Sequence, residues 1–456
     1  MTQVEKPAQN PGWLRLMPGF VQAKLSGRHN LQAALSNTSW LSMSTVFRLG
    51  LGLLVGLWVA RYLGPSRFGQ LNYAIALTSL FAALASLGSN SIVIRELVKS
   101  PEQKDVLLGS AMTLRLMGSA LAMLVVVFLV RLMRPGDTLT FWLVMLSAAG
   151  FILQSINVID LYFQARVESR YTVFSAGGAF LLMSVLKVVL ILMGAPLIDF
   201  AWAGLGEGLL MAAFLSLAFR LKNQSMRKWH PDVGVMLEIL KDSWPLMLAG
   251  ISSMIYLRVD QILIGQMLND KEVGLYSAAA RISEIWYFVP ATICSSTLPA
   301  LIASKKQNAE LYRMRLQKLA NLLVRVAVVV AVVMTFLSKP IISLLFGHSY
   351  DGSGPALSVL IWSGIPYSFG GAWGSWMTVE NRTKTIFLFH VNAAVVNLIL
   401  NLVLIPRYGI LGSAYATLIS YWIGHTVLAA IMKSQHEALL MLAKALIPFP
   451  SLFRTN

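Results

Sequence analysis

The stretch LANLLVRVAVVVAVVMTFLSKPIISLLF, residues 319–346, indicates the class of this protein. An α-helix needs about 20 mostly apolar residues to cross the hydrocarbon core of a bilayer, and this run is long enough. Similar runs recur along the 456 residues, of which 56% are hydrophobic and only 12% charged, with a mean hydropathy of +0.67. Because a soluble domain carries about 25% charged residues, the sequence predicts an all-α membrane protein.

Apolar runs bounded by charge, proline or glycine predict about twelve membrane spans. Six form an N-terminal lobe over residues 38–220 and six a C-terminal lobe over 243–433. Residues 1–37 are predicted to be a cytoplasmic or interfacial segment, 221–242 a cytoplasmic linker and 434–456 a cytoplasmic tail. The predicted spans are 40–62, 70–94, 106–130, 139–163, 171–194, 197–219, 243–267, 273–300, 319–346, 356–379, 385–405 and 409–432.

The distribution of positive charge predicts the orientation of these spans. Most of the 37 Lys and Arg residues lie in the two tails and the even-numbered loops. Since positive residues are retained on the cytoplasmic side, both termini are predicted to be cytoplasmic. The same bias accounts for most of the net charge of +17, so we do not expect a nucleic-acid partner.

The two groups of six spans resemble each other. FGQLNYA (Phe68–Ala74) at the second span matches VGLYSAA (Val273–Ala279) at the eighth, and Glu168 and Glu380 follow the fourth and tenth spans in similar loops. Six is an even number, so both copies begin on the same side of the membrane. Parallel repeats of this kind place a substrate cavity between the two lobes.

Three motifs give the chain a resemblance to a known family. NLILNLVLIPRYGILGSAYAT (Asn397–Thr417) resembles the eleventh-to-twelfth-span signature of the MOP flippase superfamily. Gly64-Pro65 with Phe68-Gly69, and RVDQILIG (Arg258–Gly265), resemble its polysaccharide-transporter branch, the Wzx-type flippases.

The resemblance implies a MATE-like fold, with two six-helix lobes in a V around a central cavity. It also implies alternating access that moves a polyprenyl-diphosphate-linked oligosaccharide, an O-antigen or exopolysaccharide repeat unit, from the inner to the outer leaflet. The implied location is the bacterial cytoplasmic membrane. A monomer that works beside polysaccharide polymerase and assembly proteins is expected, and no cofactor.

Charged residues inside spans cost roughly 2.5–3.5 kcal/mol each at a helix centre, so they pair, reach the headgroups or face a wet cavity. We expect Arg48, Arg258 and Arg281 to line a cationic cavity, because guanidinium groups bind diphosphates bidentately. Headgroup contact for Arg48 and an ion pair between Arg281 and Glu284 remain alternatives. Other charges near span ends, Arg115, Lys187, Arg325 and Asp160, are expected to reach the membrane surface.

The remaining candidates are polar. Carboxylates that could couple an ion gradient to transport are Asp260, Glu284 and Glu207. Side chains of the type that contacts sugar hydroxyls are Asn72, Gln154, Asn157, Tyr367, Asn397 and Asn401, and the alternative for these is helix-to-helix packing.

Enzymatic function is not expected. The sequence has no phosphate-binding glycine loop and no catalytic residues in a recognisable arrangement, and its single cysteine, Cys294, cannot build a metal cluster. A polymerase or ligase that uses lipid-linked sugars would carry long external loops. The nearer alternatives are a multidrug or organic-cation exporter of the same superfamily, which needs an acidic cavity, and a lipid II-type flippase, which usually has two further spans.

Overall fold

The computed structural model describes residues 29–380, 382–431 and 436–446, and within these ranges the chain forms helices and turns without a strand. Most of the predicted N-terminal segment and the end of the predicted tail lie outside the described residues. The described part of the tail forms α17 (His436–Leu446), whose Met441, Leu442 and Ala445 are buried in a cluster with α12 residues. The all-α class is confirmed.

The N-lobe contains helices that match the six predicted spans of its half. The first and second spans share α2, which is broken at Gly64. Helix α2 spans His29–Ser79. The remaining helices of this lobe are α3 (Ala82–Ser86), α4 (Asn90–Lys99), α5 (Lys104–Met133), α6 (Thr138–Gln154), α7 (Val158–Ala165), α8 (Arg170–Leu192) and α9 (Leu197–Leu221).

The C-lobe repeats this order. Its helices are α10 (Val233–Met267), α11 (Asp270–Gln307), α12 (Ala309–Phe346), α13 (Ser353–Leu360), α14 (Gly364–Val379), α15 (Thr383–Tyr408) and α16 (Ile410–Ile431). One predicted boundary is wrong. The seventh span was predicted to begin at residue 243, but α10 begins at Val233, so about half of the predicted linker 221–242 is helical. The Asp232 carboxylate caps this helix by accepting from the Val235 amide at 2.9 Å.

Nine helices among the described residues are long and apolar enough to cross a membrane by length and composition. Three predicted spans are not counted separately. The second begins inside α2 and is interrupted at Leu87 and Gly88, both with positive φ. The tenth is divided between α13 and α14 by a 3-10 turn (Ile361–Ser363); the fourth contains a similar turn, Ser155–Asn157, but only the fourth is counted across its turn. The described apolar part of the twelfth, Ile410–Gly424, is short.

The two lobes meet where the sequence repeat is clearest. Gly69 and Gly274, which occupy equivalent positions in the two copies, face each other where α2 crosses α11. A Cβ on Gly69 would overlap the Asp270 carbonyl, and a Cβ on Gly274 would overlap the Pro65 carbonyl. Contact between equivalent residues is the signature of a two-fold axis. The structure therefore agrees with a parallel repeat.

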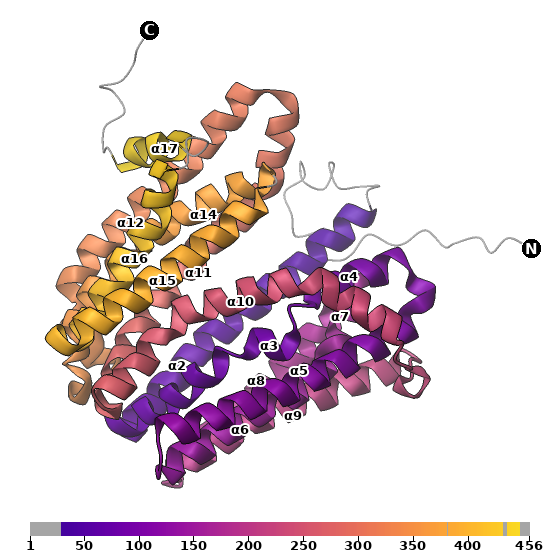
Figure 1. The fold of residues 1–456 in the computed structure, drawn as a ribbon, viewed down its shortest axis with the longest axis horizontal. Helices are drawn as coiled ribbons and strands as arrows, with labels where there is room; N and C mark the ends of the chain where they lie inside the picture. The colour runs from indigo at the N-terminus through magenta and orange to yellow at the C-terminus, as the bar shows by residue number, and fades with distance from the viewer. Residues whose placement is uncertain (1–28, 381, 432–435, 447–456) are drawn as a thin grey trace, which may run out of the picture.

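The lobes converge at one end of the molecule and diverge toward the other, which carries α17 and the first described turn of α2 (Figure 1). We call the first the sealed end. Helix α10 links the lobes, because its N-terminal half packs on α3 and α5 of the N-lobe and the helix also packs along α15 of the C-lobe. The Gly88 Cα lies so close to the Met247 amide that no side chain fits between α10 and the second span.

Candidate functional site

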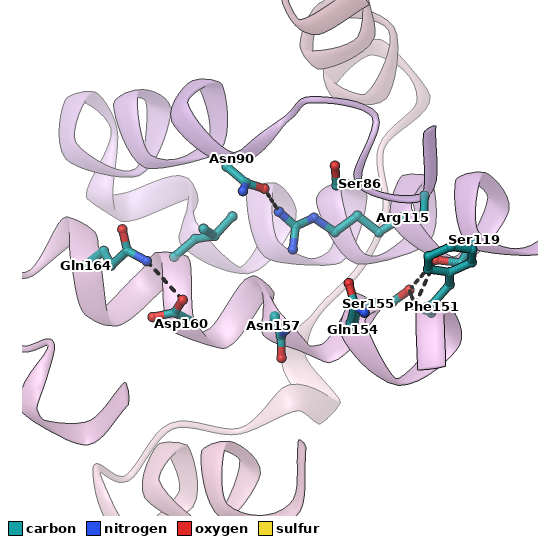
Figure 2. A pocket seen from close by; sticks show the side chains of 12 residues that line it. Ser86, Asn90, Arg115, Ser119, Phe151, Gln154, Ser155, Asn157, Asp160 and Gln164 are labelled. Carbon is teal, nitrogen blue, oxygen red and sulfur yellow. Dashed lines mark hydrogen bonds between the residues drawn. The ribbon is translucent and has the colours of Figure 1, made fainter. Parts of the chain in front are cut away.

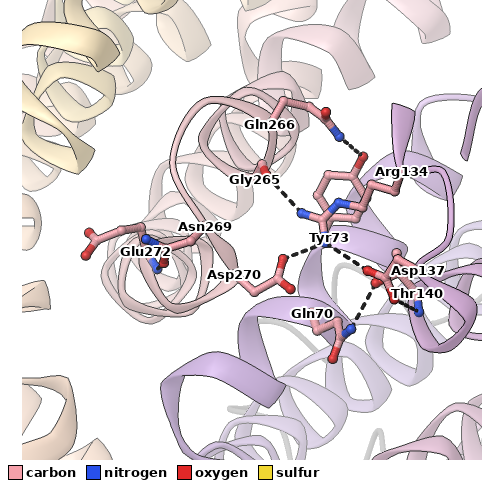
Figure 3. Close-up of polar contacts among 10 residues, drawn as sticks. All are labelled: Gln70, Tyr73, Arg134, Asp137, Thr140, Gly265, Gln266, Asn269, Asp270 and Glu272. Carbon is pink, nitrogen blue, oxygen red and sulfur yellow. Dashed lines mark hydrogen bonds and ion pairs between the residues drawn. The ribbon is translucent and has the colours of Figure 1, made fainter. Parts of the chain in front are cut away.

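Arg134, at the end of α5, joins the lobes at the sealed end (Figure 3). Its guanidinium lies 2.7 Å from the Asp270 carboxylate of α11 and donates to the Gly265 carbonyl of α10 at 3.0 Å. It also stacks over the Tyr73 ring, 3.8 Å from the centroid. The side chain is only 12% exposed, so these charge-assisted contacts are shielded from water and hold the two lobes together.

Asp137 completes this group on the N-lobe side. Its carboxylate lies 3.6 Å from Arg134 and caps α6 by accepting from the Thr140 amide at 3.0 Å. Burial raises the pKa of Asp137, but the hydrogen bonds from Thr140 and the charge of Arg134 outweigh burial, so the pKa lies below its ordinary value. Asp137 therefore stays ionised beside Arg134 at neutral pH.

Further contacts close the same end. Tyr350 donates to the Ala60 carbonyl at 2.7 Å, and Gln266 donates to the Tyr73 hydroxyl at 2.6 Å. Arg61 donates to the carbonyls of Leu344 and Leu345. Each of these bonds joins an N-lobe residue to a C-lobe residue, and together they close the lobe interface at the sealed end.

Arg281 lies between the lobes, deeper than this seal. Its guanidinium, on α11, is seated against Gly56 of α2, where a Cβ would come within 2.6 Å of Nη2. Among the described residues it forms no hydrogen bond or ion pair, and the neighbouring Glu284 accepts instead from Arg258 at 3.0 and 3.1 Å. The ion pair that was the alternative for Arg281 thus forms with Arg258 instead, and Arg281 keeps an unmatched positive charge.

Arg48 lies two helical turns before Gly56 on the same face of α2. It is 3.9 Å from Glu207 of α9 and lies over the Phe180 ring, with its side chain 40% exposed. Glu207 is also 3.6 Å from Lys187 of α8, which was expected to reach the membrane surface. The acid therefore lies between two cations, and this group carries a net positive charge.

Asp260 is fixed in a buried polar network of the C-lobe. Its carboxylate accepts from Tyr276 at 2.6 Å, from Thr417 at 2.6 Å and from Asn401 at 2.7 Å. Asn401 also donates to the Asn397 carbonyl, and both asparagines are fully buried. In this conformation Asn397 and Asn401 join α10, α15 and α16 and touch no open space, which is the packing role left open for them.

Tyr367 belongs to an aromatic cluster beside this network. Its ring stacks on Tyr287 with centroids 4.1 Å apart, and Tyr421 and Tyr256 continue the cluster at a centroid distance of 4.3 Å. Asn72 donates to the Phe68 carbonyl of its own helix at 2.7 Å. Neither side chain lines the polar pocket of the N-lobe or the small pocket beside Asp260.

Gln154 and Asn157, two of the predicted sugar contacts, line a polar pocket of about 190 Å³ inside the N-lobe (Figure 2). The pocket also contains Arg115 of α5 and Asp160 of α7, which were expected to lie at the membrane surface. Arg115 is instead 5% exposed and donates to Ser89 at 3.5 Å and to Asn90. The polar cluster Ser86, Ser89 and Asn90, adjoining Gly88, was the sequence signal for this site.

Comparison with known proteins agrees with this architecture. The sequence model of the family described as polysaccharide biosynthesis protein matches residues 34–305, and the MatE model matches 245–403. "Probable low-salt glycan biosynthesis flippase Agl15" of Haloferax volcanii is 24% identical, over 86% of this chain and 81% of its own length. "Probable flippase AglR" of the same organism is 29% identical over 39% of this chain, and the match spans only 38% of that relative.

Solved structures share the fold at low identity. An inward-facing multidrug resistance MATE transporter of the MOP superfamily superposes with a TM-score of 0.67 at 15% identity, covering 90% of this chain and 98% of that one. The inward closed lipid II flippase MurJ gives the same TM-score at 19% identity, covering 88% and 91%. The long apolar helices are those of a multi-pass membrane protein. The chain therefore belongs to the polysaccharide biosynthesis protein family and has the fold of the MATE transporters.

Proposed function

We propose that this protein is a flippase that moves a polyprenyl-diphosphate-linked oligosaccharide from the inner to the outer leaflet by alternating access. The main support for the proposal is Arg281, whose guanidinium lies between the lobes and has no ion pair among the described residues. A cation between the lobes that has no ion pair among the described residues favours an anionic ligand. A diphosphate supplies that charge, and it accepts bidentate hydrogen bonds from arginine.

The charge balance supports this substrate over the organic cations of a multidrug exporter. Arg258 and Glu284 cancel each other, which leaves Arg281 in excess, and Glu207 is shared by Arg48 and Lys187. Both groups are thus net positive and would repel a cationic drug. The name of the Haloferax relative Agl15, a probable low-salt glycan biosynthesis flippase, supports a glycan cargo as well.

The proposed transport cycle begins from the conformation described here, in which the lobes are joined at the sealed end. The sealed end, held by Arg134, closes one side, and we propose that substrate enters from the opposite side, where the lobes diverge. The charge bias favours cytoplasmic termini, and the family resemblance favours the cytoplasmic membrane of a bacterium. Asp260, Glu284 and Glu207 are the proposed coupling carboxylates, and a polysaccharide polymerase is the proposed downstream partner.

Lipid mass spectrometry of the native host, with and without this gene, tests the proposal. If the protein is the flippase, deletion causes a polyprenyl-diphosphate oligosaccharide to accumulate, and the wild-type gene on a plasmid removes it. Accumulation of no such lipid, together with increased sensitivity to organic cations, would support the exporter alternative.

A further inference from the structure

We infer that the N-lobe pocket around Arg115 binds one acidic sugar of the transported glycan through its carboxylate, so that a uronic acid is part of the substrate. The inference deepens the proposed function and rests on it. It names a second recognition site, separate from the cations between the lobes, and it predicts which sugars the protein accepts.

Arg115 places a buried positive charge in this pocket. The side chain is 5% exposed and lies roughly 16 Å along α5 from Lys104. Its Nε and Nη2 donate to Ser89 and Asn90, which are neutral, and among the described residues no carboxylate lies within ion-pair distance. Arg115 lines the pocket, and its Nη1 has no hydrogen-bond acceptor among the described residues. Since a buried cation is costly without an anion, a bound carboxylate would complete the site.

The wall of the pocket opposite Arg115 has polar side chains suited to sugar hydroxyl groups (Figure 2). Asp160 accepts from Thr172 at 2.6 Å and from Gln164 at 2.9 Å, so its oxygens are held in place. The side chains of Gln154 and Asn157 line the pocket and form no hydrogen bond with the described residues. Free amides both donate and accept, which suits the hydroxyl groups of a sugar ring.

The helices that form the pocket are interrupted beside it. Two spans are interrupted beside it: the second between α3 and α4, and the fourth at the 3-10 turn Ser155–Asn157. Irregular backbone at membrane depth is tolerated where it is buried in protein or lines a wet cavity. The second span's counterpart in the other lobe, α11, is one unbroken helix, whereas the fourth span's counterpart repeats the 3-10 turn at Ile361–Ser363. The break between α3 and α4, which brings Ser89 and Asn90 to Arg115, is therefore specific to the N-lobe.

The volume fits one ring. At about 15 Å³ for each water-sized group, a cavity of 190 Å³ holds roughly a dozen such groups. A hexuronate has a comparable number of non-hydrogen atoms, whereas a diphosphate has fewer and no hydroxyls for the amides to bind. This favours an acidic sugar over the phosphate of the carrier lipid.

Ligand-observed NMR titrations of the purified full chain in nanodiscs test the inference. The probes are glucuronate, its uncharged methyl ester, glucose and inorganic phosphate. We expect glucuronate to bind at least about 10-fold more tightly than the ester or glucose, since a charge-assisted hydrogen bond is lost in both. Arg115→Gln should remove this preference and Arg115→Lys should restore part of it. Arg131→Gln, an exposed arginine on the same helix, should leave it unchanged.

Equal binding of glucuronate and its ester to the wild-type protein would overturn the inference, even if the Arg115 variants failed to fold. So would tighter binding of phosphate, or a preference that survives Arg115→Gln. Lipid analysis of the deletion strain separates this result from the flippase proposal. If the deletion strain accumulates the lipid but the purified protein shows no preference for glucuronate, only the acidic-sugar site is refuted. If the protein prefers glucuronate but the deletion strain accumulates no lipid, only the flippase proposal is refuted.

Discussion

Among the described residues Arg281 forms no ion pair, although Glu284 lies one turn away on the same helix; Glu284 pairs with Arg258 instead. The absence of a Cβ at Gly56 lets the Arg281 guanidinium lie against the opposite lobe. These two facts make Arg281 the side chain best placed to meet an anionic headgroup between the lobes.

Replacement of Arg281 by Gln should slow translocation of a lipid-linked oligosaccharide by roughly 10- to 100-fold, since each hydrogen bond to a charged group is worth about 1.5–3 kcal/mol. Arg281→Lys should retain part of the rate. The measurement is the transport rate in proteoliposomes at matched protein content. Arg131→Gln is the control, and unchanged transport by Arg281→Gln would show that the cation is structural.

Asp260 has a different environment, with three donors and 4% exposure. Asp260→Asn should lower the thermal unfolding temperature, because an amide places its own NH₂ against a donor and leaves a buried group unsatisfied at a cost of about 1–3 kcal/mol. Asp242→Asn, at an exposed pair with Arg95, should change little. If Asp260→Asn alters the pH dependence of transport without a loss of stability, coupling and not packing is its role.

The residue types, but not their surroundings, could be predicted from the sequence. Gln154 and Asn157 were assigned to sugar contact and do line a pocket, although no measurement yet tests the assignment. Arg115 was placed at the membrane surface because its distance from a span end allowed it to reach the headgroups. Its true neighbours, Ser89 and Asn90, come from another helix, and helix-to-helix contacts are not visible in one sequence.

At the scale of elements, hydrophobic length predicted where helices occur, and the repeat predicted which of them are equivalent. The interruption of the second span was not predicted, because Leu87 in a left-handed conformation has no sequence signature. The long extensions of α11 and α12 beyond the apolar core were also missed, since their polar ends continue as helix to Gln307 and from Ala309. Length of the apolar run marks the membrane crossing and not the end of the helix.

The crossing of α2 and α11 depends on glycine. Gly69→Val should open the sealed end and lower both stability and transport, because its Cβ would overlap the Asp270 carbonyl, a backbone atom that cannot move away alone. Thermal unfolding and transport rate are the measurements. Gly50→Ala on the same helix, where nothing lies within 4 Å, is the matched control and should be neutral or stabilising by up to about 1 kcal/mol. A tolerated valine at 69 would contradict this crossing.

For the whole molecule, the contacts of Arg134 bias the two lobes toward the conformation described here. Spin labels at the exposed positions Arg67 and Lys271, one on each lobe at the sealed end, should report a short distance in otherwise unmodified protein. Arg134→Ala should shift this population toward longer distances by roughly 10-fold, the effect of about 1.4 kcal/mol. An unchanged distance distribution would mean that the lobes are held by other contacts.

The central claim is that the lobes carry an anionic, lipid-linked sugar across the bilayer. Its most direct test is a translocation assay with purified protein in vesicles that contain a fluorescent polyprenyl-diphosphate oligosaccharide, read by loss of fluorescence to an impermeant quencher. The account predicts that protein-containing vesicles expose the inner-leaflet lipid to the quencher and that Arg281→Gln vesicles do so far more slowly. Protection of that lipid in both samples, with uptake of an organic cation in the wild-type vesicles, would contradict it.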